Sequence, residues 1–310
     1  MKNTNKKTNQ TYQPLITEIK SHSLDDGKGI RSVIFFKGCP LSCEWCHNPE
    51  TINPNISISY DKNACLDFKD CINVCELHAL DPENPLFVNR DLCTLCGKCT
   101  DACASEALSL IGNTMSVEDI IEHTLRYQPF YKNSEGGVTL SGGEATLYMD
   151  FCEELLKSLK QKDINVTLET SGYFHQQRFF DKIYPYLDQI YFDIKIFDNI
   201  LHKKHCGKDN ARILENFIAL KKRADDGEVP ILARIPLIPD ITATKDNLQA
   251  IARFLISTGE TQVSLLPYNP IWSDEANKVG MPAEPTPHTW LTEEHLQKCK
   301  HYVSGLDIVN

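Results

Sequence analysis

The chain has 310 residues, of which 41% are hydrophobic and 24% are charged, and its formal net charge is −10. This composition predicts an ordered globular protein with about two domains, or one α/β barrel carrying a small insert. Net acidity argues against binding to nucleic acid and to an anionic membrane surface. No apolar run approaches the roughly 20 residues of a membrane span, so we expect no membrane partner.

The N-terminal stretch MKNTNKKTNQTYQ has no apolar core and does not predict a secretory signal. We expect a disordered tail over residues 1–14 and a cytoplasmic protein. The segment Leu15–Arg31 alternates weakly between apolar and polar residues and ends in the loop SLDDGKGIRS. The next segment, Val33–Lys37, reads as a buried strand that runs directly into a group of cysteines.

From residue 113 onward, apolar runs alternate with helical patterns. Strands are expected there at Val138–Leu140, Val166–Glu169, Gln189–Lys195, Ile231–Ile235 and Gln262–Leu266, which with Val33–Lys37 makes six. Helices are expected at Val117–Leu125, Asp150–Lys162, Gln177–Tyr184, Ala211–Ala224, Asn247–Ile256 and Glu293–Val303. Ser116 can cap the first of these helices, with Asp119 three residues on.

This alternation predicts an α/β fold with a mostly parallel sheet and helices outside it. Six such units are too few for a closed eight-stranded barrel, so we expect an open, partial (βα)6 barrel of TIM type. The barrel would use residues 15–59 and 113–310, and residues 60–112 would form an inserted domain. Residues 268–290 are rich in proline and polar residues and predict a long loop or lid.

Cysteine is the outlier of the composition, with 13 residues that are strongly clustered. Three lie between Cys39 and Cys46, and seven lie between Cys65 and Cys103. Short gaps between cysteines in a long chain without an export signal indicate metal ligation more than disulfides.

Cys39, Cys43 and Cys46 follow the first barrel strand as C-x3-C-x2-C, at the end of a strand where α/β barrels build active sites. Three thiolates can hold three irons of a four-iron cluster and leave the fourth iron open. The alternative is a zinc site with His47 as fourth ligand, which would strain two adjacent ligands.

The stretch DGKGIRSVIFFKGCPLSCEWCHNPE, Asp26–Glu50, resembles the signature of glycyl-radical-enzyme activating enzymes, which belong to the radical S-adenosylmethionine (SAM) superfamily. Lys28 is one departure, because the family usually has proline there. The resemblance extends to about residue 305, and it implies a radical SAM partial barrel with a ferredoxin-like iron–sulfur insert.

The resemblance also implies an oxidoreductase. A reduced four-iron cluster at Cys39, Cys43 and Cys46 would bind SAM and cleave it to methionine and a 5′-deoxyadenosyl radical. That radical would take a hydrogen atom from a backbone glycine of a partner glycyl radical enzyme. The implied electron donor is a flavodoxin or ferredoxin, the implied host is an anaerobic bacterium, and we expect a monomer.

Polar residues follow several predicted strands, at positions that surround SAM in the family. Gly142, Gly143 and Glu144 form the loop that meets the SAM amino group in the family, and Lys195 would face the SAM carboxylate. Asp193 and Lys195 could instead be a structural ion pair. The full implied SAM set is Trp45, His47, Gly142, Gly143, Glu144, Glu169, Ser171, Asp193, Ile194, Lys195, Arg234 and Asn269.

Some of these positions carry further implications. Trp45 would pack on the adenine or else lie in the core, and Asn269 stands where histidine is common in the family. By similarity, Glu169, Thr170 and Asp193 could frame a monovalent-cation site beside SAM. We interpret His78, His202 and His205 as ordinary histidines.

The insert consists of two similar halves. Its second half, Cys93-x2-Cys96-x2-Cys99-x3-Cys103, is a ferredoxin run, in which the fourth cysteine ligates the other cluster. The first half aligns with it through Cys65, Cys71 and Cys75, but Phe68 occupies the position of the second ligand. Crossing the ligands gives two sets, a complete one of Cys75, Cys93, Cys96 and Cys99, and an incomplete one of Cys65, Cys71 and Cys103.

The incomplete set predicts an unusual cluster. It could recruit Asp67 or Asp70, hold three irons, or be degenerate, and zinc in the insert is a further alternative. The proline that usually follows the last cysteine is also absent, at Glu76 and at Ala104. The insert could relay electrons to the SAM cluster, or serve docking or assembly.

Two other functions compete with the activating enzyme. A radical SAM enzyme with a different substrate is disfavoured by the Trp-Cys-His-Asn-Pro sequence. A non-catalytic electron-transfer protein would explain the insert but would leave the Cys39 loop, Gly143 and Asp193 without a purpose.

Overall fold

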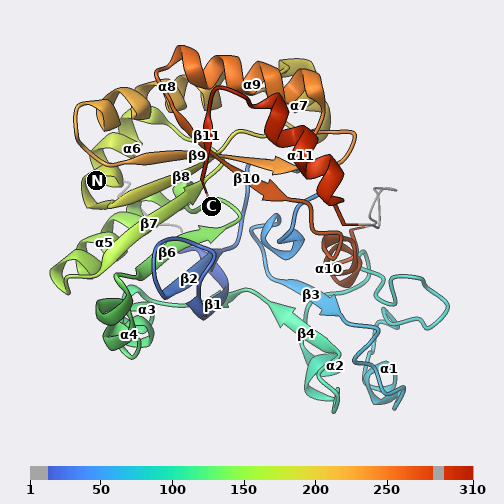
Figure 1. Cartoon of the computed structure of the whole chain (residues 1–310). Coiled ribbons are helices and arrows are strands. Elements are labelled where there is room, and N and C mark those ends of the chain that lie inside the picture. The colour runs from blue at the N-terminus through green and yellow to red at the C-terminus, as the bar shows by residue number, and fades with distance from the viewer. Residues whose placement is uncertain (1–12, 282–289, 310) are drawn as a thin grey trace, which may run out of the picture.

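The computed structural model describes residues 13–281 and 290–309. A nine-stranded sheet with the order β11-β10-β9-β8-β7-β6-β2-β1-β5 forms its centre (Figure 1). The parallel strands at its middle are β2 (Arg31–Phe36), β6 (Gly137–Gly142), β7 (Asn165–Thr170), β8 (Gln189–Asp193), β9 (Ile231–Leu237) and β10 (Gln262–Pro267). All of these lie where the sequence predicted strands, and their sequential order makes the open α/β barrel that was expected.

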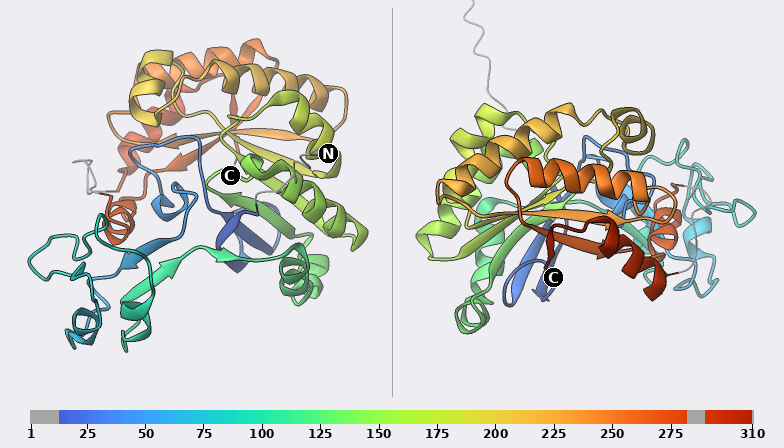
Figure 2. Two further views of the ribbon diagram at one scale, coloured as in Figure 1. Left: turned by 180° about the vertical axis from the view of Figure 1, so that it is seen from behind. Right: turned by 45° about the horizontal axis from the view of Figure 1, so that its top comes forward.

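Helices connect successive strands and cover the sheet. They are α3 (Val117–Leu125), α4 (Gln128–Ser134), α5 (Met149–Gln161), α6 (Gln176–Lys182), α7 (Asn199–Cys206), α8 (Ala211–Asp225), α9 (Lys245–Ser257), α10 (Trp272–Lys278) and α11 (Glu293–Tyr302). Helices α5, α6, α8 and α9 lie along one face of the curved sheet (Figures 1 and 2). Among the described residues, no helix combines the length and apolar character needed to cross a bilayer.

Burial of one side of each helix fixes this arrangement. In α5, Leu155, Leu156 and Leu159 are fully buried against the sheet, at the spacing of a helix face. The predicted cap of α3 is confirmed, because the Ser116 side chain accepts from the Asp119 amide while Asp119 accepts from the Ser116 amide.

Both edges of the sheet carry extra strands. β1 (Leu15–Ser23) pairs antiparallel with β2, and the short β5 (Asn113–Thr114) pairs antiparallel with β1. At the other edge, β11 (Asp307–Ile308) pairs parallel with β10. The weak alternation of the segment that follows residue 14 is therefore that of a strand near the sheet edge.

The cysteine-rich insert is closed by its own two-stranded ladder. β3 (Ser57–Tyr60) pairs antiparallel with β4 (Leu108–Ile111), from Ser57 opposite Ile111 to Tyr60 opposite Leu108. Two one-turn helices, α1 (Asp70–Asn73) and α2 (Lys98–Asp101), lie between these strands in the chain. The ladder begins before residue 60, and β5 returns to the main sheet directly after it.

The prediction of one continuous loop over residues 268–290 is wrong, because α10 lies within it. Trp272, Ser273 and Ala276 are buried on one side of this helix, and the Trp272 indole donates to the Tyr268 hydroxyl at 2.8 Å. Residues 282–289 of the predicted lid, and residues 1–12 of the predicted tail, lie outside the described residues.

Candidate active site

The loop that carries Cys39, Cys43 and Cys46 begins where β2 ends, at the carboxyl edge of the parallel strands. Its first residues are tied to the segment after it, since the Gly38 amide donates to the Thr51 carbonyl at 2.6 Å and the Cys39 amide donates to the Ile52 carbonyl at 3.1 Å. The carboxyl edge is where α/β barrels place their reactive groups. The loop therefore begins at the edge where the sequence predicts the active site.

The C-terminal end of α7 holds the middle of this loop. The Ser42 amide donates to the Cys206 carbonyl at 3.0 Å, and the Glu44 amide donates to the His205 carbonyl at 3.1 Å. The last carbonyls of a helix have no partner within the helix, so the loop satisfies two of them. The His205 ring also contacts Glu44, with 2.8 Å between Nδ1 and Oε2.

This contact was not anticipated, because His205 carries no local signal in the sequence. Cys206 is fully buried in a small apolar cluster against which Cys43 packs. Gly207 then turns with φ of 78°, and a Cβ atom there would lie 2.2 Å from the Ser42 hydroxyl. Glycine is thus needed for the backbone conformation and for the close approach.

The surroundings of the loop shift the pKa of each of its three thiols. Burial raises the pKa of Cys39, and it raises the pKa of Cys46 to about 12. Contact with the Cys206 thiol, together with nearby Lys195, lowers the pKa of Cys43. All thirteen cysteines are free of disulfides. A bound metal would supply the positive charge that buried thiolates require.

In the described part of the chain, no three His, Cys, Asp or Glu side chains are arranged around a single metal ion. In a four-iron cluster each thiolate binds a different iron atom, so its cysteines need not converge on one point.

A row of paired charges crosses the carboxyl ends of four neighbouring strands. The Ser141 hydroxyl of β6 donates to Glu169 of β7 at 2.6 Å, and Glu169 pairs with Arg234 of β9 at 2.5 Å. Arg234 also pairs with Asp193 of β8 at 3.0 Å, and Asp193 pairs with Lys195 at 3.0 Å. The four charged side chains are only 11–22% exposed.

Mutual pairing favours the charged form of Asp193, Lys195 and Arg234, whereas burial raises the pKa of Glu169 although it pairs with Arg234. Burial disfavours ionisation of Asp193, but Lys195 and Arg234 outweigh it, so its pKa is lowered. The same pairing overcomes burial and raises the pKa of both Lys195 and Arg234. With Glu169 ionised, the two carboxylates and two cations of the row balance in charge.

The Gly-Gly-Glu loop lies against the start of the cysteine loop. The Gly143 amide donates to the Phe36 carbonyl and the Glu144 amide donates to the Gly38 carbonyl, both at 2.8 Å. A Cβ atom on Gly143 would lie 2.3 Å from the Gly38 oxygen, so only glycine permits this approach.

Glu144 itself is buried and engaged within the protein. Its carboxylate accepts from the Thr146 hydroxyl at 2.7 Å, from the Thr170 hydroxyl at 2.9 Å, and from the Ser171 amide and hydroxyl at 2.9 and 2.6 Å. Glu144 therefore ties the Gly-Gly-Glu loop to the end of β7. The predicted SAM contacts of Glu144 and Ser171 stay predictions.

The three residues predicted to frame a cation have other partners here. Thr170 bonds Glu144, whereas Glu169 and Asp193 both bond Arg234. The cation site stays a prediction.

The remaining predicted SAM residues lie around the same edge. Trp45 is buried in the apolar cluster with Tyr268 and Trp272, and Ile194 is buried in the main core. His47 is exposed, and Asn269 accepts from the Ile271 amide at 3.0 Å, which shapes the turn before α10. Packing of Trp45 on the adenine stays a prediction.

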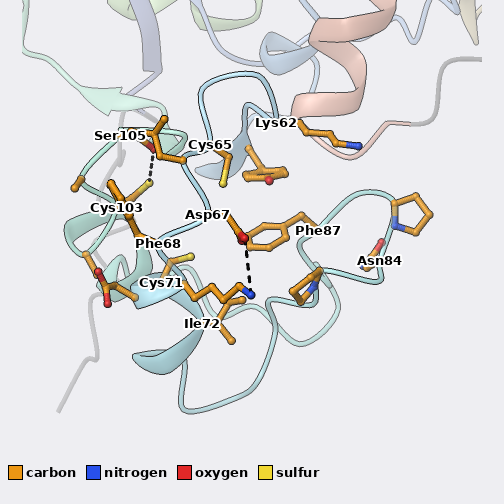
Figure 3. A pocket seen from close by; sticks show the side chains of 18 residues that line it. Lys62, Cys65, Asp67, Phe68, Cys71, Ile72, Asn84, Phe87, Cys103 and Ser105 are labelled. Carbon is orange, nitrogen blue, oxygen red and sulfur yellow. Dashed lines mark hydrogen bonds and ion pairs between the residues drawn. The ribbon is translucent and has the colours of Figure 1, made fainter.

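The insert brings its cysteines together in two separate cavities. One cavity, of about 200 Å³, is lined by Cys75, Cys93, Cys96 and Cys99. The other, of about 170 Å³, is lined by Cys65, Cys71 and Cys103, together with Phe68 and Asp67 (Figure 3). The structure thus groups the cysteines as the two crossed sets predicted from the sequence, with three in the second, and their binding of clusters stays a prediction.

The thiols that shift the pKa of Cys99 and of Cys71 belong in each case to the same cavity. Burial and the thiols of Cys93, Cys75 and Cys96 raise the pKa of Cys99 to about 11. In the other cavity, burial and the thiols of Cys103 and Cys65 raise the pKa of Cys71.

Sequence reasoning missed two groups at the active-site edge. Ser141 precedes the double glycine and could have been found by its place at the end of a predicted strand. The contact of α7 with the cysteine loop joins residues 161 positions apart, Glu44 and His205, and only the fold reveals it.

Comparison with known families agrees with this geometry. The radical SAM superfamily matches residues 89–255, and the 4Fe-4S single cluster domain matches residues 25–77, which include the three-cysteine loop. A radical SAM methyltransferase from Sphaerobacter thermophilus has the same fold, with a TM-score of 0.52 at 13% identity over 95% of this chain and 76% of its own.

Two relatives of known activity are more similar in sequence. The isethionate sulfite-lyase activating enzyme of Oleidesulfovibrio alaskensis is 35% identical over 81% of this chain and 82% of its own length. The trans-4-hydroxy-L-proline dehydratase activating enzyme of Clostridioides difficile is 35% identical over 93% of this chain and 95% of its own length. The two family matches and these relatives show that the chain belongs to the glycyl-radical-enzyme activating enzymes of the radical SAM superfamily.

Proposed function

We propose that Cys39, Cys43 and Cys46 hold the SAM-binding cluster of this activating enzyme and that the row Glu169–Arg234–Asp193–Lys195 holds SAM beside it. The observation that carries the proposal is the position of the row, at the same carboxyl edge as the three thiols. When bound, the reduced cluster supplies the electron that cleaves SAM, and the resulting radical abstracts hydrogen from a glycine of the partner enzyme.

In this proposal, the residues of this chain bind SAM and orient it. SAM carries an amino group, a carboxylate and a positive sulfonium, so its site needs both anions and cations in fixed places. The row offers both, and each charge already has a partner at 2.5–3.0 Å. Pairing limits the reorganisation needed when SAM binds, which favours a single orientation.

The cysteine loop is held on two sides, by the amides of Gly143 and Glu144 and by the end of α7. A cluster on such a loop would keep a fixed position relative to the row of charges. Removal of a hydrogen atom from a protein backbone requires close and exact placement of the reacting atoms, and a rigid loop provides it.

The insert, in this proposal, holds one ordinary four-iron cluster on Cys75, Cys93, Cys96 and Cys99. Cys65, Cys71 and Cys103 would hold a second, unusual cluster. These clusters would pass electrons from a flavodoxin or ferredoxin to the SAM cluster, and the chain would act as a monomer in the cytoplasm of an anaerobic bacterium.

The proposed partner is a glycyl radical enzyme as a class. Activating enzymes of a sulfite-lyase and of a dehydratase match this chain with the same 35% identity. Sequence similarity therefore does not single out one partner enzyme.

The test is anaerobic SAM cleavage. The iron-loaded wild type, reduced with dithionite and given SAM, is expected to release 5′-deoxyadenosine, whereas Cys43→Ala should release none. SAM should also change the electron paramagnetic resonance (EPR) spectrum of the reduced wild-type cluster. If a fully loaded wild type gave neither product nor a spectral change, the assignment of the SAM cluster would be wrong.

A further inference from the structure

The two cavities of the insert are built by the same backbone. Because Cys65, Cys71 and Cys75 align with Cys93, Cys99 and Cys103, Asp67 occupies the position of Leu95 and Phe68 that of Cys96. Leu95 has φ of 59° and Gly97 has φ of 81°; the matching residues Asp67 and Lys69 have φ of 56° and 65°. Helices α1 and α2 then begin at matching positions.

The first half thus keeps the shape of a cluster-binding loop without a glycine. Side chains other than glycine rarely adopt positive φ, and Asp67 and Lys69 both do so. A loop that had lost its ligand function would be free to relax to an ordinary conformation. The retention of this loop conformation indicates that the first cavity still binds a ligand that the loop holds.

The position before the second ligand faces the cavity in both halves. Leu95 lines its cavity and packs in the apolar cluster of the insert. Asp67 lines the other cavity together with Cys65, Cys71 and Phe87 (Figure 3). The half that lacks a cysteine ligand therefore has a carboxylate where the complete half has an apolar side chain.

Asp67 is weakly held by the protein itself. Its ion pair with Lys69 has 3.8 Å between the charged atoms, and the side chain of Asp67 is 79% exposed. Tyr60 lines the same cavity as Asp67, Cys65 and Cys71.

The other candidates fit less well. Asp70 also lines this cavity, but it directly precedes Cys71 in α1, and adjacent side chains on a helix point in directions roughly 100° apart. The residue that matches Asp70 is Lys98, whose amine pairs with Glu76 at 2.5 Å on the surface. Phe68 has no atom that could bind iron.

We propose that Asp67 is the fourth ligand of the second insert cluster and binds, through a carboxylate oxygen, the iron that has no thiolate. This inference rests on the proposed function, in which Cys65, Cys71 and Cys103 hold that cluster. Carboxylate is a harder ligand than thiolate and suits iron–sulfur clusters less well. The Asp67-bound iron is therefore the first to leave when an oxidant such as ferricyanide takes one electron. One Fe²⁺ is then released, and a three-iron cluster remains.

The experiment uses the full chain with Cys39, Cys43 and Cys46 changed to alanine, so that only the insert holds iron. Anaerobically loaded protein is examined by iron analysis, Mössbauer spectroscopy and EPR, before and after one equivalent of ferricyanide. Asp67→Ala, Asp67→Cys and the control Asp70→Ala are compared with this parent.

The parent should hold about eight irons, two clusters of four, and should show the three-iron EPR signal only after ferricyanide. Asp67→Ala should hold about seven irons and show that signal as loaded. Asp67→Cys should hold about eight irons and resist ferricyanide, and Asp70→Ala should match the parent. Because Asp67→Cys restores a thiolate, its gain of resistance does not depend on the folding of Asp67→Ala.

Two results would overturn the inference in different ways. A parent that already shows the three-iron signal, unchanged in Asp67→Ala and in Asp67→Cys, would exclude Asp67 as a ligand and leave a three-iron cluster in the cavity. A parent that holds only about four irons would exclude the second cluster itself, and with it that part of the proposed function.

Discussion

Replacement of Asp193 by asparagine tests the row of charges most directly. The Asp193 carboxylate accepts from Lys195 and from Arg234, each at 3.0 Å, and its side chain is 22% exposed. Removal of one partner from a buried ion pair costs about 3–5 kcal/mol. Asparagine keeps one oxygen that can still accept from one cation, and partial exposure weakens the effect. We therefore expect a loss of about 2–4 kcal/mol in the free energy of unfolding.

The measurement is urea unfolding of the iron-free chain, followed by circular dichroism in the presence of a thiol reductant. Glu294→Gln is the matched control, because it makes the same chemical change in the exposed pair of Glu294 with Lys298. It should leave the unfolding midpoint unchanged, since exposed pairs contribute little. If Asp193→Asn unfolded at the wild-type midpoint, the pairing in the row would contribute no stability and its proposed preorganisation would be wrong.

The pH dependence gives an independent check of the same group. Although burial opposes ionisation of Asp193, Lys195 and Arg234 lower its pKa in the folded state. A lowered carboxylate pKa contributes stability above the unfolded pKa of about 3.9, and the contribution is lost as the pH falls through the folded pKa. The difference between wild type and Asp193→Asn should thus be constant from about pH 5 to about pH 8 and should shrink below about pH 4. A difference that persists undiminished at about pH 3 would point to a cause other than charge.

Three further changes test the supports of the active site. Gly207→Ala should lower the yield of 5′-deoxyadenosine, because the added methyl group would displace Ser42. Gly227→Ala is the control, since Gly227 has a similar φ of 84° but no atom within 4 Å of its Cβ position, and it should leave the yield unchanged. Equal yields from the two variants would contradict the role of the α7 contact. Glu144→Ala should lower the unfolding free energy by about 2–4 kcal/mol in urea, because Ser171 and Thr170 lose their acceptor, and Glu144→Gln should lower it less. Tyr268→Phe should cost about 1–3 kcal/mol by leaving the buried Trp272 indole unpaired, and a wild-type urea midpoint would refute this.

Local pattern predicted the parallel strands because each carries a short, buried apolar run. The same runs revealed Arg234, since a cation inside an apolar strand needs a partner, and the structure provides Glu169 and Asp193. Strand order followed from alternation with helices. The features that the sequence predicted are thus those that depend on residues close together along the chain.

The parts that were not predicted depend on distant neighbours. Helix α7 is short, and its last residues matter through contacts with Ser42 and Glu44, far away in the sequence. Helix α10 lies in a segment rich in proline and polar residues, but Trp272 and Ala276 find an apolar cluster that only the fold assembles. The role of Glu144 in joining two loops has the same origin, because its partners Thr170 and Ser171 belong to another strand end.

The pairing of charges in the row and the backbone contacts of the cysteine loop would both order the proposed site before SAM binds. A ligand that carries two positive groups and one negative group is attracted by an unpaired carboxylate, but a buried unpaired carboxylate would first take up a proton. Lys195 and Arg234 favour the ionised form of Asp193, so in the proposed site the anion would be present before SAM binds. The loop of Cys39, Cys43 and Cys46 is fixed in the same way, by amide and carbonyl groups that no cofactor has to organise. In the proposed SAM site, the row and the loop are therefore both ordered before binding, and the binding energy of SAM would be available to place its reactive bond.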